Sequence, residues 1–115
     1  MMSVEKPGIP RSHMTPQERR ARSRLAQLMT GHGLMRGSLL VRRRKCGKPT
    51  CHCAPGEGHE SLYVVITDKG RTRQLFVPKD WEPLVRQWVA DHHQARQLME
   101  EVSRIYWDKV RKRQE

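Results

Sequence analysis

The last third of the chain limits the available folds most, because residues 84–115 contain neither glycine nor proline. Such a stretch favours one long helix, and we predict it over residues 80–113, with Asp80 as N-cap and Pro83 in the first turn. Within it, mostly apolar side chains recur at alternating intervals of four and three, the heptad spacing of a helix with one packing stripe. The positions are Trp81, Val85, Trp88, His92, Ala95, Met99, Val102 and Tyr106, and Leu84, Leu98 and Ile105 widen the stripe.

A helix of this length would extend about 50 Å at 1.5 Å per residue, which is more than a small sheet can cover. It must therefore pack on another helix, bend near residues 91–93, or pair with a second copy or a partner protein along residues 81–106. Folding back onto its own chain and forming a coiled-coil interface are equal alternatives at this point.

The beginning of the chain predicts one shorter helix. Residues 1–14 hold two prolines, one glycine and few apolar side chains, so we expect a disordered arm there. Over residues 15–31, Thr15 fits the N-cap position and Glu18 completes a capping box three residues later. Gly31 and Gly33 then end the helix, because glycine provides a backbone that tolerates a positive φ. Basic side chains occupy much of the surface of this helix.

The middle of the chain predicts three short strands. Residues 38–43, 62–67 and 72–77 read as strands, and the last two are separated by a turn sequence with Asp first and Gly third. Because side chains alternate along a strand, Leu62 and Tyr63 face opposite sides of the predicted sheet.

A cluster of cysteine and histidine lies between the first two predicted strands. Cys46, Cys51, Cys53 and His59 follow the pattern C-x4-C-x-C-x5-H, and thiolate and imidazole are the ligands that a four-coordinate structural Zn²⁺ prefers. The segment has almost no apolar side chains, so a bound metal would be what folds it. His52 is an alternative fourth ligand, and three free thiols in a reduced cell are the alternative to any metal.

Together these patterns predict an α+β chain with a small three-stranded antiparallel sheet and a Cys/His loop between two helices. The expected segments are the arm (1–14), the basic helix (15–31), the core of Cys/His loop and sheet (36–79) and the long amphipathic helix (80–113).

The basic charge is concentrated in the first two-thirds of the chain. The formal net charge of +11 divides into +5 over residues 1–36, +6 over residues 37–79 and zero over residues 80–115. A positive field confined to part of a protein attracts phosphates, so nucleic acid is the expected partner. A basic face kept for solubility is the alternative. The expected contacts are Arg42, Arg43, Arg44, Lys45, Lys48, Arg71 and Arg73 from the core, and Arg19, Arg20, Arg22 and Arg24 from the first helix.

The block around the cysteines resembles an uncharacterised bacterial family of short basic proteins. The matching residues are Arg36-Gly37-Ser38-Leu39, Arg43-Arg44-Lys45-Cys46-Gly47-Lys48-Pro49, Cys51, Cys53, Gly56 and His59. Many members are associated with transposases and mobile elements, so the resemblance implies that setting and no particular activity. Three strands followed by a helix are also similar to the arm-type DNA-binding domains of tyrosine recombinases, which insert a sheet into the major groove.

We therefore expect a DNA-binding accessory protein with a structural Zn²⁺, linked to a transposase or mobile element. RNA binding and a coiled-coil interaction module are the alternatives. If the sheet enters a groove, Arg71 and Arg73 are the expected base contacts. Only two aromatic side chains lie in the basic region, Tyr63 and Phe76, and from the sequence alone this small number argues against stacking on single strands.

Composition and motifs also argue against other classes of protein. No window approaches the ~18 uncharged apolar residues of a membrane span. No glycine-rich phosphate loop, acidic metal triad or nucleophile–base pair points to an enzyme. Three cysteines without a disulfide framework, and no apolar leader at the start, predict a cytoplasmic protein that is nucleoid-associated if it binds DNA.

Overall fold

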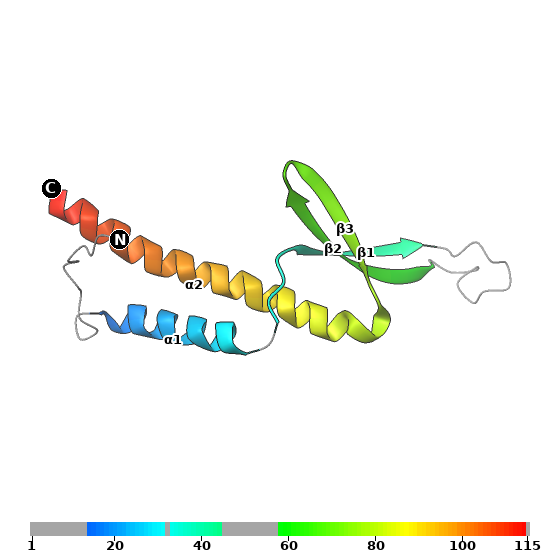
Figure 1. Ribbon diagram of the computed structural model, residues 1–115, viewed down its shortest axis with the longest axis horizontal. Helices are drawn as coiled ribbons and strands as arrows, with labels where there is room; N and C mark the ends of the chain where they lie inside the picture. Colours follow the sequence, from blue (N-terminus) through cyan, green and yellow to red (C-terminus); the bar gives the residue numbers. More distant parts are fainter. Residues whose placement is uncertain (1–13, 32, 45–57, 115) are drawn as a thin grey trace, which may run out of the picture. The chain divides into compact units, whose positions relative to one another are not determined.

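The structure is a computed structural model that describes residues 14–31, 33–44 and 58–114 (Figure 1). The elements follow the predicted α+β order of short helix, three antiparallel strands and long helix. Their bounds are α1 Pro16–Thr30, β1 Ser38–Arg44, β2 His59–Asp68, β3 Arg71–Val77, the 3₁₀ turn η2 Lys79–Trp81 and α2 Glu82–Gln114. The chain divides into a sheet unit, His32–His93, and a helical unit, which joins α1 to the part of α2 from Gln94 onwards.

The core of the sheet unit lies between the sheet and the first part of α2. The strand order is β1-β2-β3, with antiparallel pairing throughout. Leu62 and Val64 of β2 and Val77 of β3 point to one face, where they pack with Val85 and Val89 of α2. All five side chains are buried, and each contributes about 1.5–3 kcal/mol through the apolar area removed from water.

The segment before β1 is held against α2. The Met35 backbone N–H donates to the Trp88 carbonyl oxygen at 3.1 Å, and His93 Nε2 donates to the Gly37 carbonyl oxygen at 3.1 Å. Gly33 lies against the Trp88 indole, since a Cβ at this position would be 3.0 Å from the ring. These contacts fix the position of the start of β1 relative to the first part of α2.

A two-residue turn joins β2 to β3. Lys69 and Gly70 both have positive φ, 51° and 77°, which is the backbone of a type I′ turn and matches the right-handed twist of the strands. The sequence predicted a short hairpin loop over Asp68-Lys69-Gly70-Arg71, and the structure confirms the hairpin. Asp68 pairs with Arg71, so the loop itself has two residues and both strands continue to it.

Helix α1 begins and ends where the sequence predicted, without the predicted capping box. Thr15 Oγ1 accepts a hydrogen bond from the Glu18 backbone N–H at 3.1 Å, which confirms the N-cap. The Glu18 carboxylate does not complete the capping box, because it is buried and accepts from Arg22 and Tyr106, and a bond from a guanidinium is stronger than one from a neutral amide. Gly31 follows the last helical residue, as predicted, with φ −86°, so the positive φ that glycine tolerates is not used there.

In the helical unit, α1 lies antiparallel to the second part of α2 (Figure 1). Ala21 and Leu28 of α1 and Ala95 of α2 are buried. At the exposed edge, Gln17 Nε2 donates to Glu101 Oε1 at 3.0 Å. These three side chains form the buried side of the two helices.

Helix α2 is uninterrupted from Glu82 to Gln114, and its buried positions agree with the predicted stripe at Val85 and Ala95 but not throughout. Asp80 lies in η2, so it is not the N-cap of α2. Leu84, predicted to widen the stripe, is 50% exposed, whereas Val89, outside the stripe, is 3% exposed. The first part of α2 faces a broad sheet, so Val85 and Val89, one turn apart, share the contact. None of the described helices is both long and apolar enough to cross a bilayer.

Candidate nucleic-acid interface

The face of the sheet opposite α2 is defined by the strand register. Residues paired across an antiparallel sheet share a face, so the partners of Leu62 and Val64 lie toward α2 and their neighbours lie away from it. We call the latter surface the outer face. Its side chains come from Ser38, Leu40, Arg42, His59, Ser61, Tyr63, Val65, Thr67, Thr72, Gln74 and Phe76.

An apolar row crosses the middle of the outer face. The register places Leu40 of β1, Tyr63 of β2 and Phe76 of β3 opposite one another. The Tyr63 and Phe76 rings meet edge to face, with centroids 5.8 Å apart and planes at 69°. Phe76 is 52% exposed. The row is therefore an aromatic surface in contact with water.

The guanidinium group of Arg42 lies beside this row. The Cζ atom of Arg42 lies 5.4 Å from the centroid of the Tyr63 ring, within the range of a cation–π contact. None of the eleven outer-face residues is acidic. The outer face therefore combines aromatic rings with positive charge and offers no carboxylate to repel an anion.

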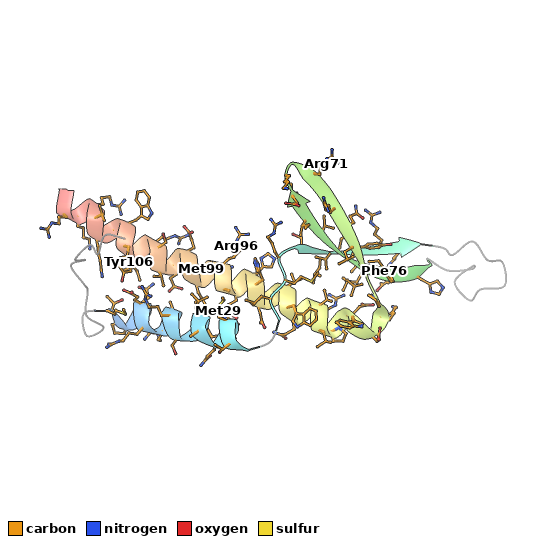
Figure 2. The ribbon with its side chains drawn as sticks, viewed as in Figure 1. Met29, Arg71, Phe76, Arg96, Met99 and Tyr106 are labelled. Carbon is orange, nitrogen blue, oxygen red and sulfur yellow. The ribbon has the colours of Figure 1, made fainter. Side chains whose placement is uncertain are left out.

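The other predicted sheet contacts do not share this face. Arg43 pairs in register with Glu60 and forms an ion pair with it on the side of α2. Arg71 and Arg73 point to that same side by alternation, and Arg71 lies at the tip of the hairpin (Figure 2). The backbone of Arg44 ends β1, and Lys45 and Lys48 lie outside the described residues. The predicted groove contacts are therefore divided between two faces.

Arg73 belongs to a hollow on the side of α2. The hollow has a volume of about 340 Å³, and its lining includes Met35, Arg36, Ile66 and Arg73. Arg36 Nη1 donates to the Thr67 carbonyl oxygen at 3.4 Å. Two guanidinium groups thus border an apolar surface next to the hairpin.

The four predicted arginines of α1 play different parts. Arg22 Nε donates to Glu18 Oε2 at 2.7 Å, and Arg24 donates to Gln27 and Gln94 at 3.1 and 3.3 Å. Arg19 and Arg20 are exposed. Arg22 therefore stabilises the helical unit, and the exposed pair is the part of this group that is suited to phosphates.

Electrostatics keep the buried Glu18 ionised. Burial raises the pKa of Glu18, but the hydrogen bonds from Arg22 and Tyr106 and the charges of Arg22 and Lys109 outweigh it, so the pKa lies below its ordinary value of 4.5. The Glu18 hydrogen bond in turn raises the pKa of Arg22. Tyr106 Oη donates to Glu18 Oε2 at 2.8 Å, and Glu18 Oε1 has no hydrogen-bond partner among the described residues.

Three of the four predicted zinc ligands, Cys46, Cys51 and Cys53, lie outside the described residues. His59 is the first residue of β2, and its Cα is paired with that of Arg44, the last residue of β1. Over residues 14–31, 33–44 and 58–114, no three His, Cys, Asp or Glu side chains gather in a way that could hold a metal.

The sequence predicted that Tyr63 and Leu62 face opposite sides of the sheet, and the structure confirms this. The sequence did not predict the contact between Tyr63 and Phe76, because that contact depends on the register of two strands. A type I′ turn at Lys69-Gly70 was the signal that could have fixed the register, since a two-residue turn determines every pair that follows.

The chain can now be compared with known proteins and protein families. Neither the curated proteins nor the solved structures contain a match to the chain. A family model described as a domain of unknown function, DUF6788, matches residues 14–87, which include α1, the whole sheet and the start of α2. Because the match covers more than half of the sequence, the chain belongs to the DUF6788 family.

Proposed function

We propose that the chain is a nucleic-acid-binding accessory protein whose ligand is DNA and whose main contact surface is the outer face. The observation that carries the proposal is the composition of that face, where Arg42 lies over Tyr63 beside Phe76 and no acidic residue is present. The proposal assigns no catalytic step.

The distribution of charge within the sheet unit supports the outer face over the opposite one. Glu60 and Asp68 both point toward the side of α2, so a phosphate backbone that approaches the outer face meets no carboxylate from the strands. Residues 37–79 carry a formal net charge of +6. A polyanion gains from such a field both in encounter rate and through release of its counterions.

A structural Zn²⁺ held by Cys46, Cys51, Cys53 and His59 is part of the proposal. The donor types support it, because three thiolates and one imidazole suit tetrahedral zinc. The place of His59 supports it too, since pairing with Arg44 brings the two ends of the intervening segment together at one end of the sheet. A metal at that point would add Arg44, Lys45 and Lys48 to a surface continuous with the strands.

Association with a transposase or other mobile-element enzyme is the biological setting that we propose. It follows from the resemblance described for the cysteine block. A pull-down from cells carrying the element, with DNA digested beforehand, would recover that enzyme only if the two proteins bind each other directly.

The binding proposal is tested by the salt dependence of affinity. Fluorescence anisotropy with a labelled oligonucleotide should show affinity falling by orders of magnitude between about 50 and 200 mM salt if ~6 phosphates are contacted. Arg42→Ala should weaken binding about fivefold and reduce the salt slope. The matched control is Arg86→Ala, an exposed arginine of α2, which should change affinity less than twofold. A flat salt response contradicts the proposal.

The zinc proposal has a separate test. Purified protein should contain about one zinc per chain, and Cys51→Ser should lose it. His52→Ser is the control, because it should retain zinc if His59 is the fourth ligand. If His52→Ser loses the metal and His59→Ser retains it, His52 and not His59 is the fourth ligand. Metal-free protein that binds DNA with unchanged affinity would remove zinc from the proposal.

A further inference from the structure

The two aromatic rings of the outer face form a contact surface that the charge argument does not explain. Tyr63 and Phe76 are paired across β2 and β3, and Figure 2 shows Phe76 on its strand. Leu40 continues the row on the other side of Tyr63 and is also exposed. The small number of aromatic side chains argued against stacking from the sequence alone, but the fold brings the two rings together. Phosphate binding requires none of these side chains, so the row favours a ligand that has a flat apolar surface.

Nucleobases supply such a surface together with the matching charge. Base–aromatic stacking needs an exposed ring, and it tolerates any sequence because every base has a π-face. The guanidinium of Arg42 lies over the Tyr63 ring, so it turns away from the ring when a base stacks there and can then pair with the phosphate of that base. Ser61 and Gln74 of the outer face add neutral hydrogen-bonding groups beside the row.

The geometry of the row favours unpaired bases. The ring centroids lie 5.8 Å apart, whereas bases along one strand of B-DNA are separated by about 3.4 Å. Bases that stack on both rings must therefore be drawn apart, and the 69° between the ring planes also turns them relative to each other. A single strand can adopt this arrangement, while a duplex would first have to lose its base pairs.

We infer that the outer face binds single-stranded DNA by stacking bases on Tyr63 and Phe76, with Arg42 beside them on the backbone. The inference rests on the proposed nucleic-acid-binding function and specifies the form of the ligand. Duplex DNA contacts the same charges but leaves the aromatic row unused, so it binds more weakly.

The test compares full-length protein on labelled oligo(dT) and on a blunt duplex of equal length at one salt concentration. We expect at least tenfold tighter binding to oligo(dT). Phe76→Leu should weaken oligo(dT) binding about tenfold, because it removes a stacking surface and keeps an apolar side chain. It should leave duplex binding and the salt slope unchanged, because no charge is altered.

Two variants control for folding and for the loss of an exposed aromatic ring. Phe76→Tyr should retain oligo(dT) binding, since it keeps the ring. Trp107→Leu removes an aromatic side chain that is 75% exposed and lies in the helical unit, and it should have no effect. If Phe76→Tyr loses as much affinity as Phe76→Leu while both keep the wild-type circular dichroism spectrum, stacking is not the mode of binding.

The remaining outcomes separate this inference from the proposed function. Salt-dependent binding that is equal for duplex and oligo(dT), with Phe76→Leu unaffected, overturns the inference and keeps the proposed function. Absence of salt-dependent binding to either oligonucleotide overturns both. Binding to oligo(U) more than tenfold tighter than to oligo(dT) would reassign the ligand to RNA. Dimerisation without nucleic acid that Phe76→Leu abolishes would assign the row to a second copy.

Discussion

Glu18 is the one buried charged side chain among the described residues. One of its carboxylate oxygens accepts from both Arg22 and Tyr106, and the other has no partner in the described part of the chain. A buried carboxylate in this position stabilises the helical unit only while it is ionised, because its two donors are arranged for a negative acceptor.

The stability of the helical unit should therefore depend on pH through Glu18. Its pKa is lower in the folded chain than the ordinary 4.5, so its contribution is complete above that value and is lost as the pH falls through the folded pKa. Tyr106→Phe should destabilise the protein by about 1 kcal/mol at pH 7. The difference from wild type should shrink below about pH 4 in thermal melts followed by circular dichroism. A difference that is constant with pH contradicts this assignment.

Substitutions at two glycines distinguish the free-energy cost of backbone strain from that of side-chain crowding. Gly37 has φ +150°, and a Cβ there would lie 2.4 Å from Val64 Cγ1, whereas a Cβ at Gly70 would have no atom within 4 Å. Gly70→Ala should cost about 1–2 kcal/mol through its positive φ alone. Gly37→Ala adds overpacking and should cost about 2–4 kcal/mol. Urea titration measures both, and equal values would show that the sheet relaxes around Gly37.

At the scale of elements, the Thr15 cap and the hairpin turn were readable from the sequence, whereas the predicted Asp80 cap was wrong and the tertiary contacts were not readable. Thr15 and the Asp68-to-Arg71 turn placed the start of α1 and the β2–β3 hairpin, because both signals act within four residues. Register and the buried face of α2 depend on partners distant in sequence. The heptad pattern therefore included Leu84 and omitted Val89, although the sheet contacts the second and not the first.

A pair of substitutions in α2 tests this correction. Val89→Ala removes two methyl groups from the core of the sheet unit and should lower the free energy of unfolding by about 2 kcal/mol. Leu84→Ala changes an exposed position and should alter it by less than about 0.5 kcal/mol. The two values come from the same denaturation experiment, and the reverse order would place Leu84, the position predicted to widen the stripe, in the core in place of Val89.

At the scale of the whole molecule, α2 is used by both units. Val85 and Val89 are buried with the sheet, and Ala95 is buried in the helical unit. This supports the reading in which the helix folds back on its own chain. Exposed Trp81 and Met99 belong to the predicted stripe as well, and a homodimer or partner protein along residues 81–106 stays a prediction.

Truncation of the chain should show that the sheet depends on the first part of α2. A stop codon after Lys79 removes the cover from Leu62, Val64 and Val77, which is about 5–8 kcal/mol of burial and comparable to the stability of a whole domain. The sheet should then be unfolded in amide proton NMR spectra. A stop codon after His93 keeps that cover, and dispersed strand resonances should remain. Dispersed resonances in the shorter chain would mean that α2 is dispensable for the sheet.

The turn at Lys69-Gly70 has a consequence for selectivity among ligands. Because side chains alternate with a period of two, insertion of one residue into this turn would carry Phe76 to the side of α2 and bring a neighbour into its place. The spacing and parity of the rings are thus set about six residues away, at a position that contacts no base in the inferred complex. Relatives with a turn of even or odd length at this point would therefore present different side chains to a nucleic acid, even where their strands share the same residues.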